Sequence, residues 1–90
     1  MADHRSDKKI EFTVVVNGTG VQVHANTNAP LASVFEKALH EAHVGGDQDP
    51  EKWEFKDAQG HVYDSDKKLS ELGMGQGSIV YLSLKAGVTG

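Results

Sequence analysis

The feature that most constrains the fold of this chain is one amphipathic stretch between residues 31 and 42. We expect Asn28 to cap this stretch as a helix, and Gly45 and Gly46 to end it. The remaining residues predict no other helix of comparable length, so the apolar stripe can only be buried against a sheet. The stripe recurs at the i, i+3, i+4, i+7 spacing of one helix face and consists of Leu31, Val34, Phe35, Ala38, Leu39 and Ala42.

Strand-like segments lie on both sides of the predicted helix. Apolar residues alternate with other residues over 10–16, and the alternation resumes over 21–25 after the turn-forming Asn17-Gly18-Thr19-Gly20. This pattern is typical of a β-hairpin with a short turn. A chain of 90 residues forms a single domain with a modest core, so the hairpin and the helix must share that core.

The second half of the chain predicts shorter elements and one long strand. We expect short strands at 53–55 and 61–63, a helical turn at 69–73, and a last strand at 78–85. In the last strand Val80, Leu82 and Leu84 face inward, whereas Ile79 and Tyr81 face outward. The long connections favour parallel pairing of the first and last strands. The predicted fold class is therefore α+β: a mixed sheet of four to five strands packed on one helix.

The predicted domain organisation is a β-rich domain over residues 9–85 between two flexible tails, 1–8 and 86–90. A net charge of −4 argues against nucleic-acid binding, since phosphates need a basic surface. The chain has no cysteine and no apolar run near the ~20 residues that span a bilayer. We expect a cytoplasmic monomer that binds neither nucleic acid nor membrane.

The last third of the chain resembles a known family. Leu69-Ser70-Glu71-Leu72-Gly73-Met74, followed by Ile79-Val80-Tyr81-Leu82, resembles the closing segment of ubiquitin-like proteins. Trp53-Glu54-Phe55 and the turn before Gly60 are similar to their third strand and its loop. The span from Lys9 to Lys85 is compatible with their β-grasp topology. Within this superfamily, the chain resembles the ubiquitin-like modifiers of bacterial conjugation operons.

The resemblance implies a function for the C-terminal tail. Members are activated with ATP at a C-terminal glycine and transferred through enzyme cysteines to a target. Their partners are an activating enzyme, a conjugating enzyme and a deubiquitinase-like protease. The conjugation tail would here be Gly87, Val88, Thr89 and Gly90, although modifiers usually end in Gly-Gly. The chain itself needs no cofactor and is expected not to be an enzyme.

The resemblance also implies a partner-binding face on the sheet, opposite the helix. Its expected residues are Val15, His24, Glu54 and Tyr81, with Tyr81 as an aromatic anchor. Glu54 stands where ubiquitin presents an apolar residue, so partners that read the usual apolar patch should not bind in the usual way. A single exposed aromatic is also common on surfaces without function.

Two other motifs carry little chemistry. His40 and His43 lie near Asp47, but a metal site needs a third ligand that is held in place, so no metal is expected. The segment 73–77 is glycine-rich, yet a strand follows it where a phosphate loop needs a helix, so we interpret it as a turn with Met74 buried. Two alternatives to conjugation stay open: a non-covalent adaptor and, with less support, a sulfur carrier.

Overall fold

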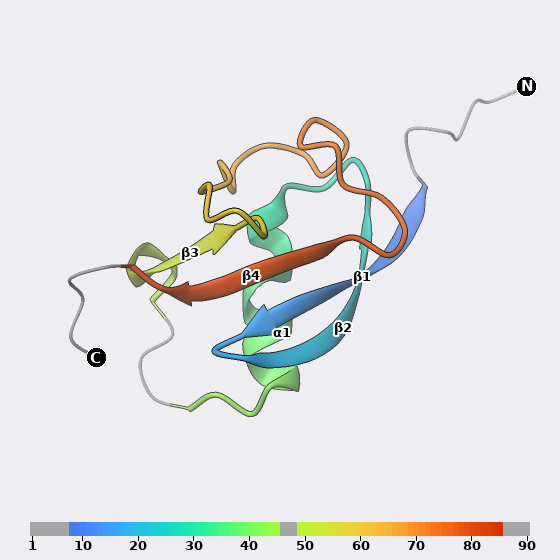
Figure 1. Cartoon of the computed structure of the whole chain (residues 1–90). Coiled ribbons are helices and arrows are strands. Elements are labelled where there is room, and N and C mark those ends of the chain that lie inside the picture. The colour runs from blue at the N-terminus through green and yellow to red at the C-terminus, as the bar shows by residue number, and fades with distance from the viewer. Residues whose placement is uncertain (1–7, 46–48, 86–90) are drawn as a thin grey trace, which may run out of the picture.

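The structure is a computed structural model that describes residues 8–45 and 49–85. Within these ranges, a four-stranded sheet of order β2-β1-β4-β3 packs one face against a single α-helix (Figure 1). This arrangement confirms the predicted mixed α+β fold, with four strands. The elements are β1 (Lys9–Val16), β2 (Thr19–Asn26), the 3-10 turn η2 (Leu31–Val34), α1 (Phe35–Glu41), the 3-10 turn η3 (Pro50–Lys52), β3 (Trp53–Lys56) and β4 (Ile79–Leu84).

The hairpin of β1 and β2 forms as its sequence predicts. Its turn is made by Asn17 and Gly18, which both adopt positive φ angles, of 50° and 89°. Two positive φ angles in a two-residue loop match the twist of the flanking strands. The register that follows pairs Phe12 with Val23 and Val14 with Val21, which brings the apolar side chains of both strands to the helix-facing side.

The helix is shorter than predicted and begins with a 3-10 turn. Pro30 is extended (φ −70°, ψ 152°), and Asn28 does not cap the helix. The first backbone N–H groups are instead satisfied by a distant loop: Leu31 donates to the carbonyl of Lys67 (3.0 Å) and Ala32 to that of Ser65 (2.9 Å). The next donors form 3-10 bonds, Ser33 N–H to the carbonyl of Pro30 (3.0 Å) and Phe35 N–H to that of Ala32, so the α-helix itself starts only at Phe35.

The helix also ends earlier than the glycines suggested. His43, with φ 58°, takes the left-handed position that we expected of Gly45 and Gly46. Val44 N–H donates to the carbonyl of Leu39 (2.9 Å) and His43 N–H to that of His40 (3.1 Å). This pair of bonds is a Schellman motif, in which Val44 turns back toward the core. The prediction was wrong because glycine is only the commonest residue at this position, not a required one; Gly46 lies outside the described residues.

Strand β4 lies inside the sheet, between β1 and β3. It runs parallel to β1 and antiparallel to β3, which confirms the predicted pairing of first and last strands. The expected strand at 61–63 is absent; only one bridge joins Val62 to Lys56, and Tyr63 N–H donates to the carbonyl of Phe55 (2.8 Å). The segment then leaves β3 to reach the start of the helix, so it cannot continue the ladder.

The long connection from residue 64 to residue 78 contributes to the core as well as linking strands. Leu69 is fully buried and Met74 is buried next to the other core side chains. Met74 N–H donates to the carbonyl of Leu69 (3.0 Å), and Gly73 between them has a φ of 74°. The segment 73–77 is thus a turn with Met74 buried, as predicted. No helix in the described residues is long and apolar enough to cross a membrane.

The core lies between the sheet and the helix. Val14, Leu39 and Val80 are completely buried, and the rings of Phe35 and Trp53 meet edge to face with centroids 6.1 Å apart. The other face of the sheet has no helix over it in the described part of the chain (Figure 1). We call this second face, formed by the outward side chains of the four strands, the outer face.

Candidate functional site

The outer face is built by the period-2 alternation of its strands. In β4, Val80 and Leu82 are buried, while Ile79 is 54% exposed and Tyr81 is 37% exposed. In β1, Thr13 and Val15 lie between buried neighbours and are themselves partly exposed. Three large exposed hydrophobic side chains occur in the described residues, and two of them, Ile79 and Tyr81, are on this face.

The strand register places these side chains in adjacent rows. Tyr81 of β4 pairs with Val15 of β1 on one side and with Lys56 of β3 on the other. Ile79 pairs with Thr13 in the next row of outward residues. Directly opposite side chains in a sheet lie close enough to contact one another. The outer face therefore carries an apolar strip of Val15, Ile79 and Tyr81, with Thr13 and Lys56 beside it.

Glu54 lies next to this strip, as the sequence suggested. It pairs in register with Ser83, one outward position along from Tyr81, and its carboxylate contacts Lys56 Nζ at 3.6 Å. Its side chain is only 18% exposed. A partner that contacts Tyr81 would therefore meet a carboxylate and an ammonium group where ubiquitin presents an apolar side chain.

His24 occupies a separate corner of the outer face. It pairs with Glu11 rather than with Val15, and its Nε2 lies 3.5 Å from the Glu11 carboxylate. The residue opposite Val15 on β2 is Gly20, and His24 follows it by four positions along the strand, or about 13 Å. The structure thus pairs Val15 with Tyr81, places Glu54 on the other side of Tyr81, and leaves His24 apart from them.

The sequence reasoning missed a hollow beside Tyr81. Its volume is about 390 Å³, and two turns form its walls: the hairpin turn at Asn17 and Gly18, and the loop from Asp57 to Gly60. The sequence predicted both turns, from Asn17-Gly18 and from the segment Asp57 to Gly60. Their position beside Tyr81 depends on strand order and register, which the two patterns do not specify.

Asp57 fixes the shape of the second turn. Its Oδ1 accepts hydrogen bonds from the backbone N–H groups of His61 (2.9 Å) and Gln59 (2.8 Å). The bond from His61 is the main reason why the pKa of Asp57 is lowered, with the Gln59 bond and the nearby His61 side chain adding to it against a smaller effect of burial. The ionised carboxylate therefore holds this wall of the hollow in place.

Comparison with known proteins identifies the chain's family. A family model described as "Protein of Unknown function (DUF2604)" matches residues 5–90. The chain belongs to this family. It is also 49% identical over 82 residues to the uncharacterized protein y4jI of Sinorhizobium fredii (strain NBRC 101917 / NGR234), covering 91% of this chain. The match spans 62% of that relative's length.

Solved structures show the fold of this DUF2604 chain. It is similar to Caldiarchaeum subterraneum ubiquitin, with a TM-score of 0.68 and 17% identity over 92% of this chain and 100% of that one. It is also similar to the EccD5 ubiquitin-like domain from Mycobacterium xenopi, with a TM-score of 0.68 and 13% identity over 90% and 99% of the two chains. At these identities the likeness shows the fold alone: the DUF2604 chain has a ubiquitin-like β-grasp fold.

The other predicted site, the conjugation tail from Gly87 to Gly90, lies outside the described residues. The described structure ends at Lys85, whose N–H donates to the carbonyl of Lys52 (2.9 Å). This bond extends the pairing of β4 with the chain before β3 by one residue. Lys85, the last described residue of this DUF2604 chain, is thus held at the β3 edge of the sheet.

The possible metal ligands of the DUF2604 chain are not brought together by what the structure describes. Asp47 lies outside the described residues. Within 8–45 and 49–85, no group of three or more His, Asp or Glu side chains is placed to hold a metal ion.

Proposed function

We propose that the chain is a ubiquitin-like protein modifier, activated at Gly90 and transferred through enzyme cysteines to a target. The observation that carries this proposal is the ubiquitin-like fold, in which β4 carries Ile79 and Tyr81 of the apolar strip and is the last described strand before Lys85. In this proposal the chain is not an enzyme. It is the substrate of an activating enzyme, a conjugating enzyme and a deubiquitinase-like protease.

The chemistry needs only a reachable carboxylate on this chain. The Gly90 carboxylate attacks the α-phosphorus of ATP and releases pyrophosphate, which leaves an acyl adenylate. A cysteine thiolate of the activating enzyme then displaces AMP and forms a thioester, and an amine of the target finally displaces the thiol to form an amide. Six residues, from Lys85 to Gly90, reach at most ~20 Å when extended, which lets the carboxylate enter a channel while the domain stays outside.

The outer face would supply the docking surface for these enzymes. Tyr81 and Ile79 offer apolar area beside the hollow, and the Glu54–Lys56 pair adds charges of both signs. Aromatic anchors in a fixed setting commonly dominate binding energy. The replacement of an apolar residue by Glu54 would select partners different from those of ubiquitin.

Mass spectrometry of conjugates tests the proposal. Trypsin cuts after Lys85, so a target lysine modified through Gly90 would keep a branch of sequence Ala-Gly-Val-Thr-Gly, residues 86–90. The protein is expressed with an N-terminal tag in cells of its own source and purified under denaturing conditions. The branch should appear on lysines for the wild type and be missing for a chain that lacks Gly90.

A non-covalent adaptor is the second candidate. It is favoured by the length of y4jI, in which the matched region is 62% of the chain and therefore one part of a longer protein. An adaptor would show no lysine branch, and its partners would bind equally well without Gly90. A sulfur carrier is a weaker third proposal, because Thr89 takes the place of the first glycine of a Gly-Gly end.

A further inference from the structure

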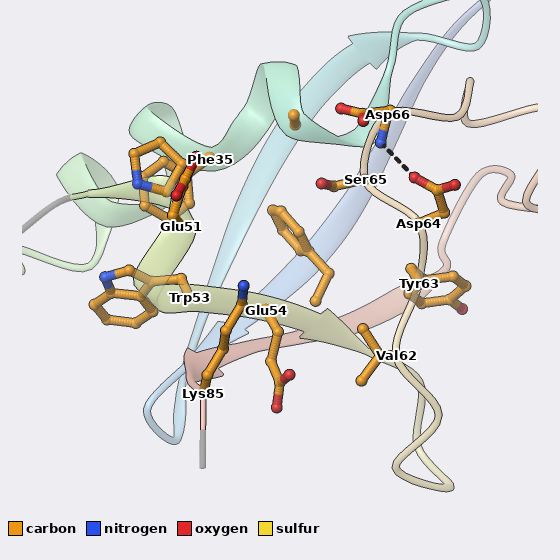
Figure 2. Close-up of a pocket in the computed structure, with 13 residues that line it drawn as sticks. Phe35, Glu51, Trp53, Glu54, Val62, Tyr63, Asp64, Ser65, Asp66 and Lys85 are labelled. Atoms are coloured by element: carbon orange, nitrogen blue, oxygen red, sulfur yellow. Dashed lines mark hydrogen bonds between the residues drawn. The ribbon is translucent and has the colours of Figure 1, made fainter. Parts of the chain in front are cut away.

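A second concave surface lies at the edge of the sheet, away from the centre of the outer face. It has a volume of about 470 Å³ and is formed by three segments: the start of the helix, residues 50–55, and residues 62–66, with Lys85 at one end. Figure 2 shows Trp53 and Glu54 on β3, with Val62, Tyr63 and Asp64 on the segment that passes its end. We call it the β3-edge groove.

The floor of the β3-edge groove is aromatic. Phe35, Trp53 and Phe55 contribute to the lining and are themselves 4–5% exposed, so they form a rigid base rather than mobile contacts. Val62 stands at the rim with 59% of its surface exposed, more than any other large hydrophobic residue described. Burial, followed by the charge of Asp57, raises the pKa of Tyr63 above its ordinary value of 10.0.

The rim of the groove is acidic. Its lining includes four carboxylates and one ammonium group: Glu51, Glu54, Asp64, Asp66 and Lys85. Glu54 contacts Lys56 on the outer face, whereas Glu51, Asp64 and Asp66 are exposed and make no ion pair with another described residue.

This excess of carboxylates determines which ligands the β3-edge groove can bind. Three exposed carboxylates around a low-dielectric aromatic floor attract cations and repel phosphate groups, so nucleic acids and anionic lipid surfaces are disfavoured. Arginine and lysine combine a cationic head with an apolar stem that can lie on Val62 and on the floor. β3 lies at one edge of the described sheet and supplies Trp53, Glu54 and Phe55 to the lining, so the groove follows a strand and suits an extended segment.

We propose that the β3-edge groove binds an extended, basic segment of a partner protein. Its arginine or lysine side chains reach Glu51, Asp64 and Asp66, and its apolar side chains contact Val62. This interaction uses neither the outer face nor Gly90, so it stands or falls separately from the proposed transfer reaction.

Peptide binding to the whole chain tests the inference. The probe is a fluorescein-labelled peptide of alternating arginine and valine, and its counterpart carries glutamate in place of arginine. Fluorescence anisotropy should show saturable binding of the basic peptide and none of the acidic one. The double variant Glu51→Gln/Asp66→Asn should weaken binding of the basic peptide by ~5-fold, since each of the two exposed ion pairs is worth a factor of about 2 to 3.

The matched control is Glu36→Gln/Glu41→Gln on the exposed side of α1, which changes the net charge equally. It should weaken binding by less than ~2-fold, because those carboxylates lie outside the groove. Val62→Ser tests the apolar part at constant charge and should also weaken binding. Equal losses in both double variants, or no saturable binding of the basic peptide, would overturn the proposal.

Chemical shift mapping gives a second measurement that does not depend on any variant. Peptide-induced changes should centre on the amides of Trp53 and Val62 and on those of residues 64–66. Changes centred on Val15 and Tyr81 instead would move the binding site to the outer face and overturn the assignment.

Discussion

The outer face and the β3-edge groove differ in how the chain builds them. The outer face comes from regular alternation along paired strands, so Tyr81 and Val15 meet because the register requires it. The groove joins the start of the helix to two loop-rich segments, 50–55 and 62–66. Its charge also differs: carboxylates predominate in the groove, while the centre of the outer face is apolar with one Glu–Lys pair. One fold thus offers two surfaces with different chemistry and different structural supports.

The outer face and the β3-edge groove rest on the same buried core, so a substitution in that core should have the largest effect on both. Leu39 is fully buried beneath the sheet, so Leu39→Ala should lower the free energy of unfolding by ~2–5 kcal/mol. Glu36→Ala, on the exposed side of the same helix, should change it by less than ~0.5 kcal/mol. Chemical denaturation compares the two, and equal effects would mean that the helix does not anchor the fold.

The outer face can be tested separately from the groove through its aromatic side chain. Tyr81→Ala should weaken binding of an activating enzyme by ~1–3 kcal/mol while the domain stays folded, since Tyr81 does not belong to the buried core. Val62→Ala, on the groove rim, should leave this affinity within ~0.5 kcal/mol. Calorimetry measures both. An unchanged affinity for Tyr81→Ala would make Tyr81 an incidental surface residue.

A substitution in the hairpin turn, which forms one wall of the hollow beside Tyr81, should have a smaller effect on stability. Gly18 has a φ of 89°, so Gly18→Ala should destabilise the protein by ~1 kcal/mol even though open space surrounds a Cβ there. Gly20→Ala is the control: it lacks the positive φ, and its Cβ would meet Thr13 Cγ2 at an ordinary 3.5 Å. Thermal unfolding should separate the two variants. Equal stabilities would show that the hairpin turn relaxes without cost.

The smallest expected effect is the change of stability with pH that comes from Asp57, in the other turn that lines the hollow. Asp57 has a pKa below its ordinary value of 3.8, so its ionised form stabilises the folded state at higher pH. That contribution is present above 3.8 and is lost as the pH falls through the lower pKa of the folded protein. Asp57→Asn keeps an acceptor for the two N–H groups but cannot titrate. It should lose less stability than the wild type between about pH 5 and about pH 2.

The sequence predicted the parts of the fold that depend on local periodicity. The alternation in 10–16 and 78–85 placed Tyr81 outward and Val80 inward, because side-chain direction follows from strand geometry alone. The ends of the helix were wrong because they depend on residues far away in sequence. The loop carbonyls of Ser65 and Lys67 replace the expected cap, and no pattern around Asn28 reveals them.

The residues of the candidate sites also divide into those that the sequence could place and those that it could not. Val15 and Tyr81 could be placed on one face from sequence, but the distance of His24 from them required the register. The β3-edge groove was not predicted at all. Its carboxylates lie in segments 51–54 and 64–66, which become neighbours only when the loop after β3 turns back toward the helix.

The position of β4 also affects how this protein is made. Of the four described strands, β4 is the last to leave the ribosome, yet it occupies the middle of the sheet between β1 and β3. The backbone N–H of Glu11 donates to the side-chain oxygen of Gln76 (3.0 Å), which is synthesised 65 residues later. Until β4 arrives, the hairpin exposes an unpaired edge rich in valine, a template for pairing with other chains. Synthesis that stops before Ile79 should therefore release a chain that aggregates rather than one that is merely less stable.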